Sequence, residues 1–236
     1  EQFVVPEDVA PGRFRLAALT ANGNLDGLAK AVAQWKPAYA GIVDAKGAAV
    51  PAGWGRGAQC LVEAAQHPEA DVVLNAVVGA AGLDATLAAL TADKRVALAN
   101  KETLVIGGAL VQRAARAHGE ALNHPTWAMG KKITIDSASL ANKALEVIEA
   151  HVLFGVPYEK IEVVVHPQSI IHSMVEFEDG SVLAQMGVPS MELPVLYALT
   201  YPERLEDDGV PRFDPVKHAA LTFEAVRHDV FPTLGL

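Results

Sequence analysis

Asp71-Val-Val-Leu-Asn-Ala-Val-Val78 is the stretch of this sequence that decides its fold. Nearly every position in it is apolar, which is typical of a parallel strand buried on both faces. The segment Gly79-Ala-Ala-Gly82 follows directly, and a helix-length run over residues 83–90 comes next. The order of strand, turn and helix predicts one βα unit of a parallel α/β sheet.

Similar units lie on both sides of this strand. Between residues 13 and 119, short apolar runs alternate with helix-length amphipathic runs. This alternation predicts a parallel sheet covered by helices. We expect strands over 13–19, 39–43 and 95–99, and helices over 25–34, 58–66, 83–90 and 103–118, the last ended by Gly119. The Pro- and Gly-rich stretch 41–57 is predicted to be a surface loop.

The second half of the sequence has a different pattern. A short strand over 132–135 is predicted to lead into a helix over 138–154, with Asp136 or Ser137 as its N-cap. Strands are expected over 161–165, 171–177 and 182–186, and the turn 178–181 joins the last two into a hairpin. The α/β first half is therefore followed by an α+β part, which we divide into domains 1–122 and 123–236.

Composition narrows the class of partner and compartment. A chain of 236 residues that is 51% hydrophobic can bury a sizeable core. Its formal net charge of -9 disfavours binding to nucleic acid or an anionic membrane, so we expect a small-molecule partner. The single cysteine, Cys60, excludes an intrachain disulfide, and no apolar run approaches the ~20 residues of a membrane span. No signal peptide opens the sequence, so the expected location is cytoplasmic.

Ligands of parallel α/β sheets bind at the carboxyl ends of the strands. Two such ends are chemically suggestive here, the turn 79–82 and the polar run Asn100-Lys101-Glu102. Backbone amides of the turn could face a dinucleotide, and Lys101 could hold a phosphate or polarise a carbonyl. An ordinary βα turn and a solvated surface turn are the alternatives, and from these features alone they are favoured.

A stronger pattern runs from Asp136 to Glu146. In a helix, Asn142 and Glu146 are four residues apart with Lys143 beside them, so an amide, an ammonium and a carboxylate share one side. Ser137 at the amino-terminal edge adds a hydroxyl where an anion is favoured. These groups suit a sugar phosphate beside a divalent cation. A capped helix with a wet polar face explains the spacing equally well.

Histidines of the second half fall into two groups. His124-Pro-Thr-Trp-Ala-Met-Gly130 is a Pro- and Gly-bounded loop that resembles a lid over a ligand, with a hydrophobic loop packed on the core as the alternative. His166 and His172 come at strand ends without a third ligand at metal spacing, so we expect structural hydrogen bonds rather than a zinc site. The sequence contains no Ser-His-Asp, CxxC, HExxH or Walker motif.

Five ordered segments together resemble the 1-deoxy-D-xylulose 5-phosphate reductoisomerase family, over about residues 13–236. They are Val78-Gly-Ala-Ala-Gly-Leu83, Leu98-Ala-Asn-Lys-Glu102, His124-Pro-Thr-Trp-Ala-Met-Gly-Lys-Lys132, Asp136-Ser137 with Asn142, Lys143 and Glu146, and His166-Pro-Gln-Ser with Ile171-His-Ser173. The resemblance implies a Rossmann-like, NADPH-binding parallel-sheet domain followed by an α+β catalytic and dimerisation domain. It implies NADPH- and Mg²⁺- or Mn²⁺-dependent isomerisation and reduction of 1-deoxy-D-xylulose 5-phosphate to 2-C-methyl-D-erythritol 4-phosphate in the non-mevalonate isoprenoid pathway. A homodimer, formed through the sheet of the second half, is also implied.

The resemblance also assigns roles to single residues. Catalysis is expected of Lys101 and Glu146, and Glu146 is the expected metal ligand. Substrate contacts are expected from Lys101, His124, Ser137, Asn142, Lys143 and Glu146, with Trp127 and Met129 in a flap. Cofactor contacts are expected from Asn22, Gly23, Asn24, Asn100, Glu102 and Gly130. Hard oxygen ligands suit magnesium or manganese.

Three parts of the family pattern have no match in this sequence. They are a Gly-rich turn after the strand stub Phe3-Val-Val5, the Asp-Ser-Glu metal motif and Ser-Gly-Gly loop expected between Leu122 and Asn123, and a helical domain expected after Leu236. Either ligand-binding loops of a longer enzyme are not represented, which we favour, or the protein is a deleted form that does not turn over. Two other functions stay open: a different NADP-dependent oxidoreductase of a phosphorylated small molecule, and a catalytically silent dimerising module.

Overall fold

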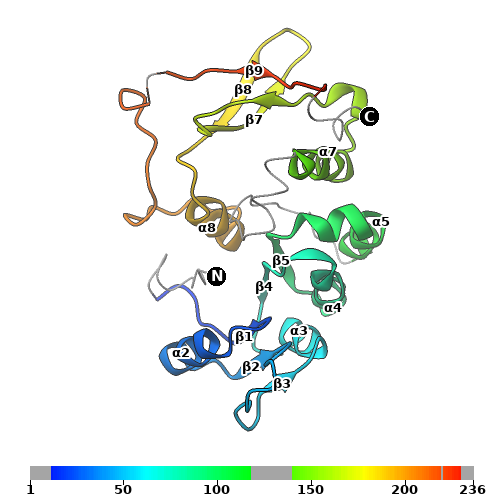
Figure 1. The fold of residues 1–236 in the computed structure, drawn as a ribbon, viewed down its shortest axis with the longest axis vertical. Coiled ribbons are helices and arrows are strands. Elements are labelled where there is room, and N and C mark those ends of the chain that lie inside the picture. The colour runs from blue at the N-terminus through cyan, green and yellow to red at the C-terminus, as the bar shows by residue number, and fades with distance from the viewer. Residues whose placement is uncertain (1–11, 118–139, 219, 230–236) are drawn as a thin grey trace. The chain divides into compact units, whose positions relative to one another are not determined.

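The structure, a computed structural model, describes residues 12–117, 140–218 and 220–229. These residues divide into two compact units (Figure 1). The first unit holds residues 12–117 together with Pro194–Leu205, and the second holds residues 140–193, 206–218 and 220–229. In the described part of the chain, no helix is both long and apolar enough to cross a membrane.

The first unit alternates strands and helices. In chain order it contains β1 (Ala18–Ala21), α2 (Leu25–Trp35), β2 (Tyr39–Ile42), β3 (Gly55–Arg56), α3 (Gln59–Ala65), β4 (Val72–Asn75), the short helix η1 (Gly79–Gly82), α4 (Leu83–Thr91), β5 (Arg95–Leu98) and α5 (Lys101–Ala117). Parallel pairing joins β1 to β2, β2 to β3, and β4 to β5. The predicted parallel α/β class is confirmed.

One core cluster anchors the β1 and β2 end of this unit. Ala21, Leu28 and Ile42 are buried together, and Val50 and Trp54 from the loop before β3 pack against them. That loop was predicted to be a plain surface loop over 41–57, but its end forms β3 because Gly41 and Gly55 pair in register. The apolar side chains of the loop therefore fix its position on the sheet edge.

Close packing of α3 against β2 surrounds Cys60, the one cysteine of the sequence. A Cβ on Gly41 would lie 2.7 Å from the Cβ of Cys60, so α3 can approach β2 only because position 41 is glycine. Cys60 is fully buried, and this burial raises the pKa of its thiol to about 11. A thiol with so high a pKa is a packing group rather than a nucleophile.

The strand expected over 71–78 is shorter than predicted. β4 ends at Asn75, and Val72 to Leu74 are only partly buried rather than buried on both faces. The reason is the Asn75 side chain, whose Oδ1 accepts a hydrogen bond from Val77 N at 3.1 Å and turns the chain. Val78 is consequently 65% exposed. The strand expected over 13–19 likewise begins only at Ala18.

The second unit is built from one long helix and antiparallel strands. It contains α7 (Ala141–Phe154), the short helix η2 (Tyr158–Lys160), β6 (Val164–Val165), β7 (Ile171–Glu176), β8 (Val182–Met186) and β9 (Glu224–Ala225). The predicted hairpin is confirmed, since β7 pairs antiparallel with β8, and β6 pairs antiparallel with β9. The strand expected over 161–165 shortens to Val164–Val165, the two residues that pair with β9.

The start of α7 differs from the prediction. The helix begins at Ala141 rather than near residue 138, and Leu140 precedes it in the left-handed conformation with φ 55° and no side-chain cap. The N-cap position of α7 is therefore Leu140 rather than Asp136 or Ser137. The strand expected over 132–135 lies outside the described residues.

Helix α8 (Glu192–Thr200) was not predicted, and most of it belongs to the first unit. The Arg95 guanidinium donates hydrogen bonds to Leu199 O at 2.7 Å and Tyr201 O at 2.9 Å. Arg13 forms an ion pair with Glu203 at 2.9 Å. A domain boundary at residue 122 stays a prediction. The first unit also includes Pro194–Leu205, a segment from much later in the chain.

Candidate functional site

Two buried asparagines shape the carboxyl ends of β4 and β5. Asn75 Nδ2 donates to Gly82 O and to Thr86 Oγ1, both at 2.7 Å. Asn100 Nδ2 donates to Val77 O and to Gly79 O, the second at 2.9 Å. Because both side chains are almost fully buried, the turn between β4 and α4 has a single hydrogen-bonded shape.

Glycine is required at both ends of this turn. Gly79 has a φ of 76°, which other residues rarely adopt. At Gly82 a Cβ would lie 2.8 Å from Asn100 Nδ2 and 2.9 Å from Asn75 Nδ2. The backbone of the predicted turn thus packs closely against two side-chain amides. It lies at a strand end, where ligands of parallel sheets bind.

Asn100, an expected cofactor contact, also has a structural task. Its Oδ1 accepts a hydrogen bond from Thr103 N at 2.8 Å, so it caps the start of α5, while its amide group donates to the turn. Both ends of the side chain are therefore used within the protein. Lys101 and Glu102 follow as the first residues of α5 and are partly buried. The sequence analysis did not single out Asn75. Its polar side chain within an otherwise apolar strand was the signal that could have identified it.

The expected adenosine-binding turn follows β1. Asn24 Oδ1 accepts from Gly27 N at 2.9 Å and caps α2, so this side chain too shapes the backbone. Asn22 O accepts a hydrogen bond from Asp44 N at 2.7 Å, which ties the turn to the segment after β2. Asn22, Gly23 and Asn24, whose cofactor role is expected from the family resemblance, thus follow directly on the carboxyl end of β1.

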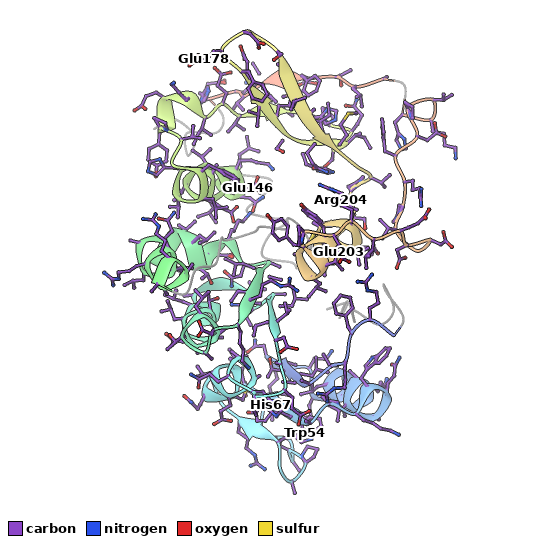
Figure 2. All side chains as sticks on the ribbon, turned by 180° about the vertical axis from the view of Figure 1, so that it is seen from behind. Trp54, His67, Glu146, Glu178, Glu203 and Arg204 are labelled. Atoms are coloured by element: carbon purple, nitrogen blue, oxygen red, sulfur yellow. The ribbon has the colours of Figure 1, made fainter. Side chains whose placement is uncertain are left out.

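The second unit brings three of the predicted site residues into contact on α7. Asn142 Nδ2 donates to Glu146 Oε1 at 2.9 Å, and Lys143 Nζ contacts Glu146 Oε2 at 2.8 Å. Asn142 is 2% exposed, and the Lys143 and Glu146 side chains are 32% and 21% exposed. Figure 2 labels Glu146 on this helix. Each oxygen of one carboxylate therefore has its own donor, which fixes its orientation.

The described residues do not by themselves complete a metal site. They contain no cluster of three or more His, Cys, Asp or Glu side chains suited to a metal ion. His166 Nδ1 is 2.8 Å from Thr222 O and His172 Nε2 is 3.0 Å from Gly187 O, so both histidines have hydrogen-bond partners of the kind expected of them. His124, Trp127, Met129, Gly130 and Ser137 lie outside the described residues.

Three family models match the sequence. The model described as 1-deoxy-D-xylulose 5-phosphate reductoisomerase matches residues 4–108. The model described as the C-terminal domain of that enzyme matches residues 87–154, and one described as DXP reductoisomerase C-terminal domain matches residues 186–236. The matches follow the order of the segments on which the resemblance was based.

Solved structures agree with the sequence matches. A 1-deoxy-D-xylulose 5-phosphate reductoisomerase from Zymomonas mobilis in complex with NADPH is 37% identical, with a TM-score of 0.81 over 95% of this chain and 73% of that chain. A DOX-P reductoisomerase in complex with NADPH, fosmidomycin and magnesium is 34% identical, with a TM-score of 0.86 over 96% of this chain and 72% of that one. The Rossmann-like fold class is confirmed.

Curated relatives carry the same name. The enzyme of Methylobacillus flagellatus is 44% identical over 290 residues, covering 96% of this chain and 73% of its own length. The enzyme of Symbiobacterium thermophilum is 43% identical over 290 residues, covering 96% of this chain and 74% of its own length. The alignment spans 290 positions, whereas 96% of 236 residues is about 227 residues. About 63 positions are therefore occupied in the relative but not in this sequence, as expected from the internal segments of the family pattern that have no match here. By sequence and by fold, the chain belongs to the 1-deoxy-D-xylulose 5-phosphate reductoisomerase family.

Proposed function

We propose that this protein converts 1-deoxy-D-xylulose 5-phosphate into 2-C-methyl-D-erythritol 4-phosphate, with NADPH as reductant and Mg²⁺ or Mn²⁺ as metal. The observation that carries the proposal is the cluster of Asn142, Lys143 and Glu146 on α7. Relatives with this name share over 40% of their aligned residues with the chain, and one solved relative is a complex with NADPH, fosmidomycin and magnesium. A phosphorylated substrate fits the ammonium and amide donors of the cluster.

The α7 cluster has two tasks in this proposal. Glu146 contributes one hard oxygen ligand to the metal, and Asn142 and Lys143 keep its carboxylate oriented. Lys143, being partly exposed, can also contact the substrate's phosphate or hydroxyl oxygens.

The first unit is proposed to hold NADPH at the carboxyl ends of its strands. The turn between Gly79 and Gly82 offers a backbone surface held by Asn75 and Asn100, and the turn 22–24 offers a second one. When bound there, NADPH would supply the hydride for the reduction. Lys101, at the start of α5, is proposed to stabilise oxyanion charge on the substrate, and Glu102 to lie beside the nicotinamide.

One assay separates this function from the two alternatives. On the full-length protein, NADPH oxidation should require both 1-deoxy-D-xylulose 5-phosphate and Mg²⁺ or Mn²⁺. Oxidation with another phosphorylated substrate but not this one would favour a different NADP-dependent oxidoreductase. NADPH oxidation that no substrate stimulates would favour the catalytically silent module.

We also propose a cytoplasmic homodimer that forms through β7 and β8. A two-stranded hairpin is marginally stable alone, yet apolar residues stand exposed on both of its faces. Val175 pairs with Leu183 at exposures of 57% and 66%, and Met174 and Val182 are 45% and 52% exposed. A second copy of the hairpin would cover these side chains. The cytoplasmic location is proposed because one buried cysteine leaves no disulfide that needs an oxidising compartment.

Val175→Lys is expected to convert a dimer into a monomer, because it places a charge at the centre of the proposed apolar interface. Sedimentation velocity at micromolar concentration measures the change. Val216→Lys is the matched control, since Val216 is 83% exposed elsewhere in the same unit, and this variant should stay dimeric. A dimeric Val175→Lys protein, or a monomeric wild type, would contradict the proposed interface.

A further inference from the structure

We propose that Lys46 is the residue by which this protein prefers NADPH to NADH, through contact with the 2′-phosphate of the adenosine ribose. The inference rests on the proposed NADPH-dependent function and adds a specificity-determining residue to it. Lys46 has no role in the family pattern from which the other site residues were expected. Its assignment comes from the contacts around Gly23.

The turn after β1 and the segment after β2 are joined at one edge of the sheet. Because β1 and β2 are parallel, with Ala21 opposite Ile42, their carboxyl ends meet there. Val43 N donates to Ala21 O at 3.0 Å and Asp44 N donates to Asn22 O at 2.7 Å, so the pairing continues beyond the strands. Whatever follows β2 therefore lies directly beside the adenosine-binding turn.

Lys46 lies over the glycine of that turn. A Cβ on Gly23 would be 3.3 Å from Lys46 Cε and 3.8 Å from its Nζ. In dinucleotide-binding sheets, an acidic residue at such a strand end binds the 2′-hydroxyl of NADH, whereas a cationic residue donates hydrogen bonds to the 2′-phosphate of NADPH. The turn Asn22-Gly23-Asn24 has no carboxylate, and the ammonium of Lys46 stands above its middle residue.

The backbone holds Lys46 in this place. Its N–H donates to Asp44 Oδ1 at 2.9 Å, and Ala48 N donates to Ala45 O at 3.0 Å. Positive φ angles of 51° at Lys46 and 80° at Gly47 are those of a type I′ turn. Beyond the turn, Val50 and Trp54 pack on the core, so both sides of the loop are anchored. Binding of a ligand to the ammonium therefore costs little backbone entropy in this loop.

Charges nearby leave Lys46 available for an anion. Among the residues that the structure describes, Lys46 forms no ion pair, and its side chain is exposed. The carboxylate of Asp44 is occupied on Oδ1 by the Lys46 amide, and Arg56 at the end of β3 donates to Val50 O at 3.2 Å. Asp26 in the first turn of α2 is the other nearby acid along the chain. A dianionic phosphate would gain a direct partner at Lys46.

Binding of two adenosine fragments tests the inference without catalysis. Lys46→Met should weaken binding of 2′,5′-ADP about tenfold and leave 5′-AMP within about twofold, as expected for one lost charge-assisted contact. Isothermal titration calorimetry on the full-length protein gives both dissociation constants. The 2′,5′-ADP effect should shrink with added salt, because Lys46 is exposed.

Lys36→Met is the matched control. Lys36 is also an exposed lysine in the left-handed conformation, with φ 48°, but it ends α2 at the opposite edge of the sheet. The Lys36→Met protein should bind both fragments like the wild type. A Lys46→Met protein that keeps the wild-type preference for 2′,5′-ADP overturns the assignment alone. A wild type without preference for NADPH over NADH contradicts the proposed cofactor as well.

Discussion

Lys143→Ala is expected to lower kcat/KM for 1-deoxy-D-xylulose 5-phosphate by about a hundredfold or more, the cost typical of removing one charged donor from an active site. Two losses combine in this variant. The substrate loses an ammonium donor, and Glu146 Oε2 loses the partner that lies 2.8 Å away. A carboxylate that has lost its Lys143 donor is less well oriented for a metal. Steady-state NADPH oxidation at saturating metal measures the effect.

Lys217→Ala is the control that separates this role from that of a surface ion pair. Lys217 and Asp214 have the same i,i+3 spacing as Lys143 and Glu146, but their nitrogen–oxygen distance is 3.7 Å and the lysine side chain is 78% exposed. Such a pair contributes under about 1 kcal/mol, so its loss should leave kcat/KM unchanged. Equal activities for the two variants would show that Lys143 is only part of a wet polar face.

Helical spacing predicted the α7 cluster because residues four apart must meet on one face. Asn142 and Glu146 do so, and Lys143 joins them as an i,i+3 partner. Spacing could not predict where the helix starts. The start of α7 follows the left-handed conformation of Leu140, which local propensity does not encode.

Strand ends were harder to predict than strand positions. An apolar run shows that a strand exists, but the end of β4 depends on the Asn75 side chain turning back to Val77 N. Asn100, which the family resemblance made a candidate for cofactor contact, makes the same kind of inward hydrogen bond. Helix α8 was not predicted because a proline, Pro194, normally argues against a helix, although it is tolerated near a helix start. In addition, its partner Arg95 is about a hundred residues away in the sequence.

Gly82→Ala is expected to destabilise the protein by about 3 kcal/mol and to weaken NADPH binding at least about tenfold. Gly82 has a φ of -80°, so alanine meets no backbone penalty and the effect is steric. Its Cβ would lie 2.8 Å from Asn100 Nδ2 and 3.0 Å from Asn75 Oδ1. Both asparagines are buried, so neither can move into water, and shifting either one leaves buried polar groups of the turn without partners.

Urea unfolding followed by circular dichroism measures the free energy of unfolding, and NADPH titration measures the binding loss. Gly187→Ala is the control, because its Cβ would have its nearest neighbours at 3.7 and 3.8 Å, in ordinary van der Waals contact. That variant should differ from the wild type by less than about 0.5 kcal/mol. If Gly82→Ala is equally stable and binds NADPH normally, the turn tolerates a side chain at position 82. The two asparagines would then not control its shape, and the proposed cofactor surface at the carboxyl ends of β4 and β5 would lose its structural basis.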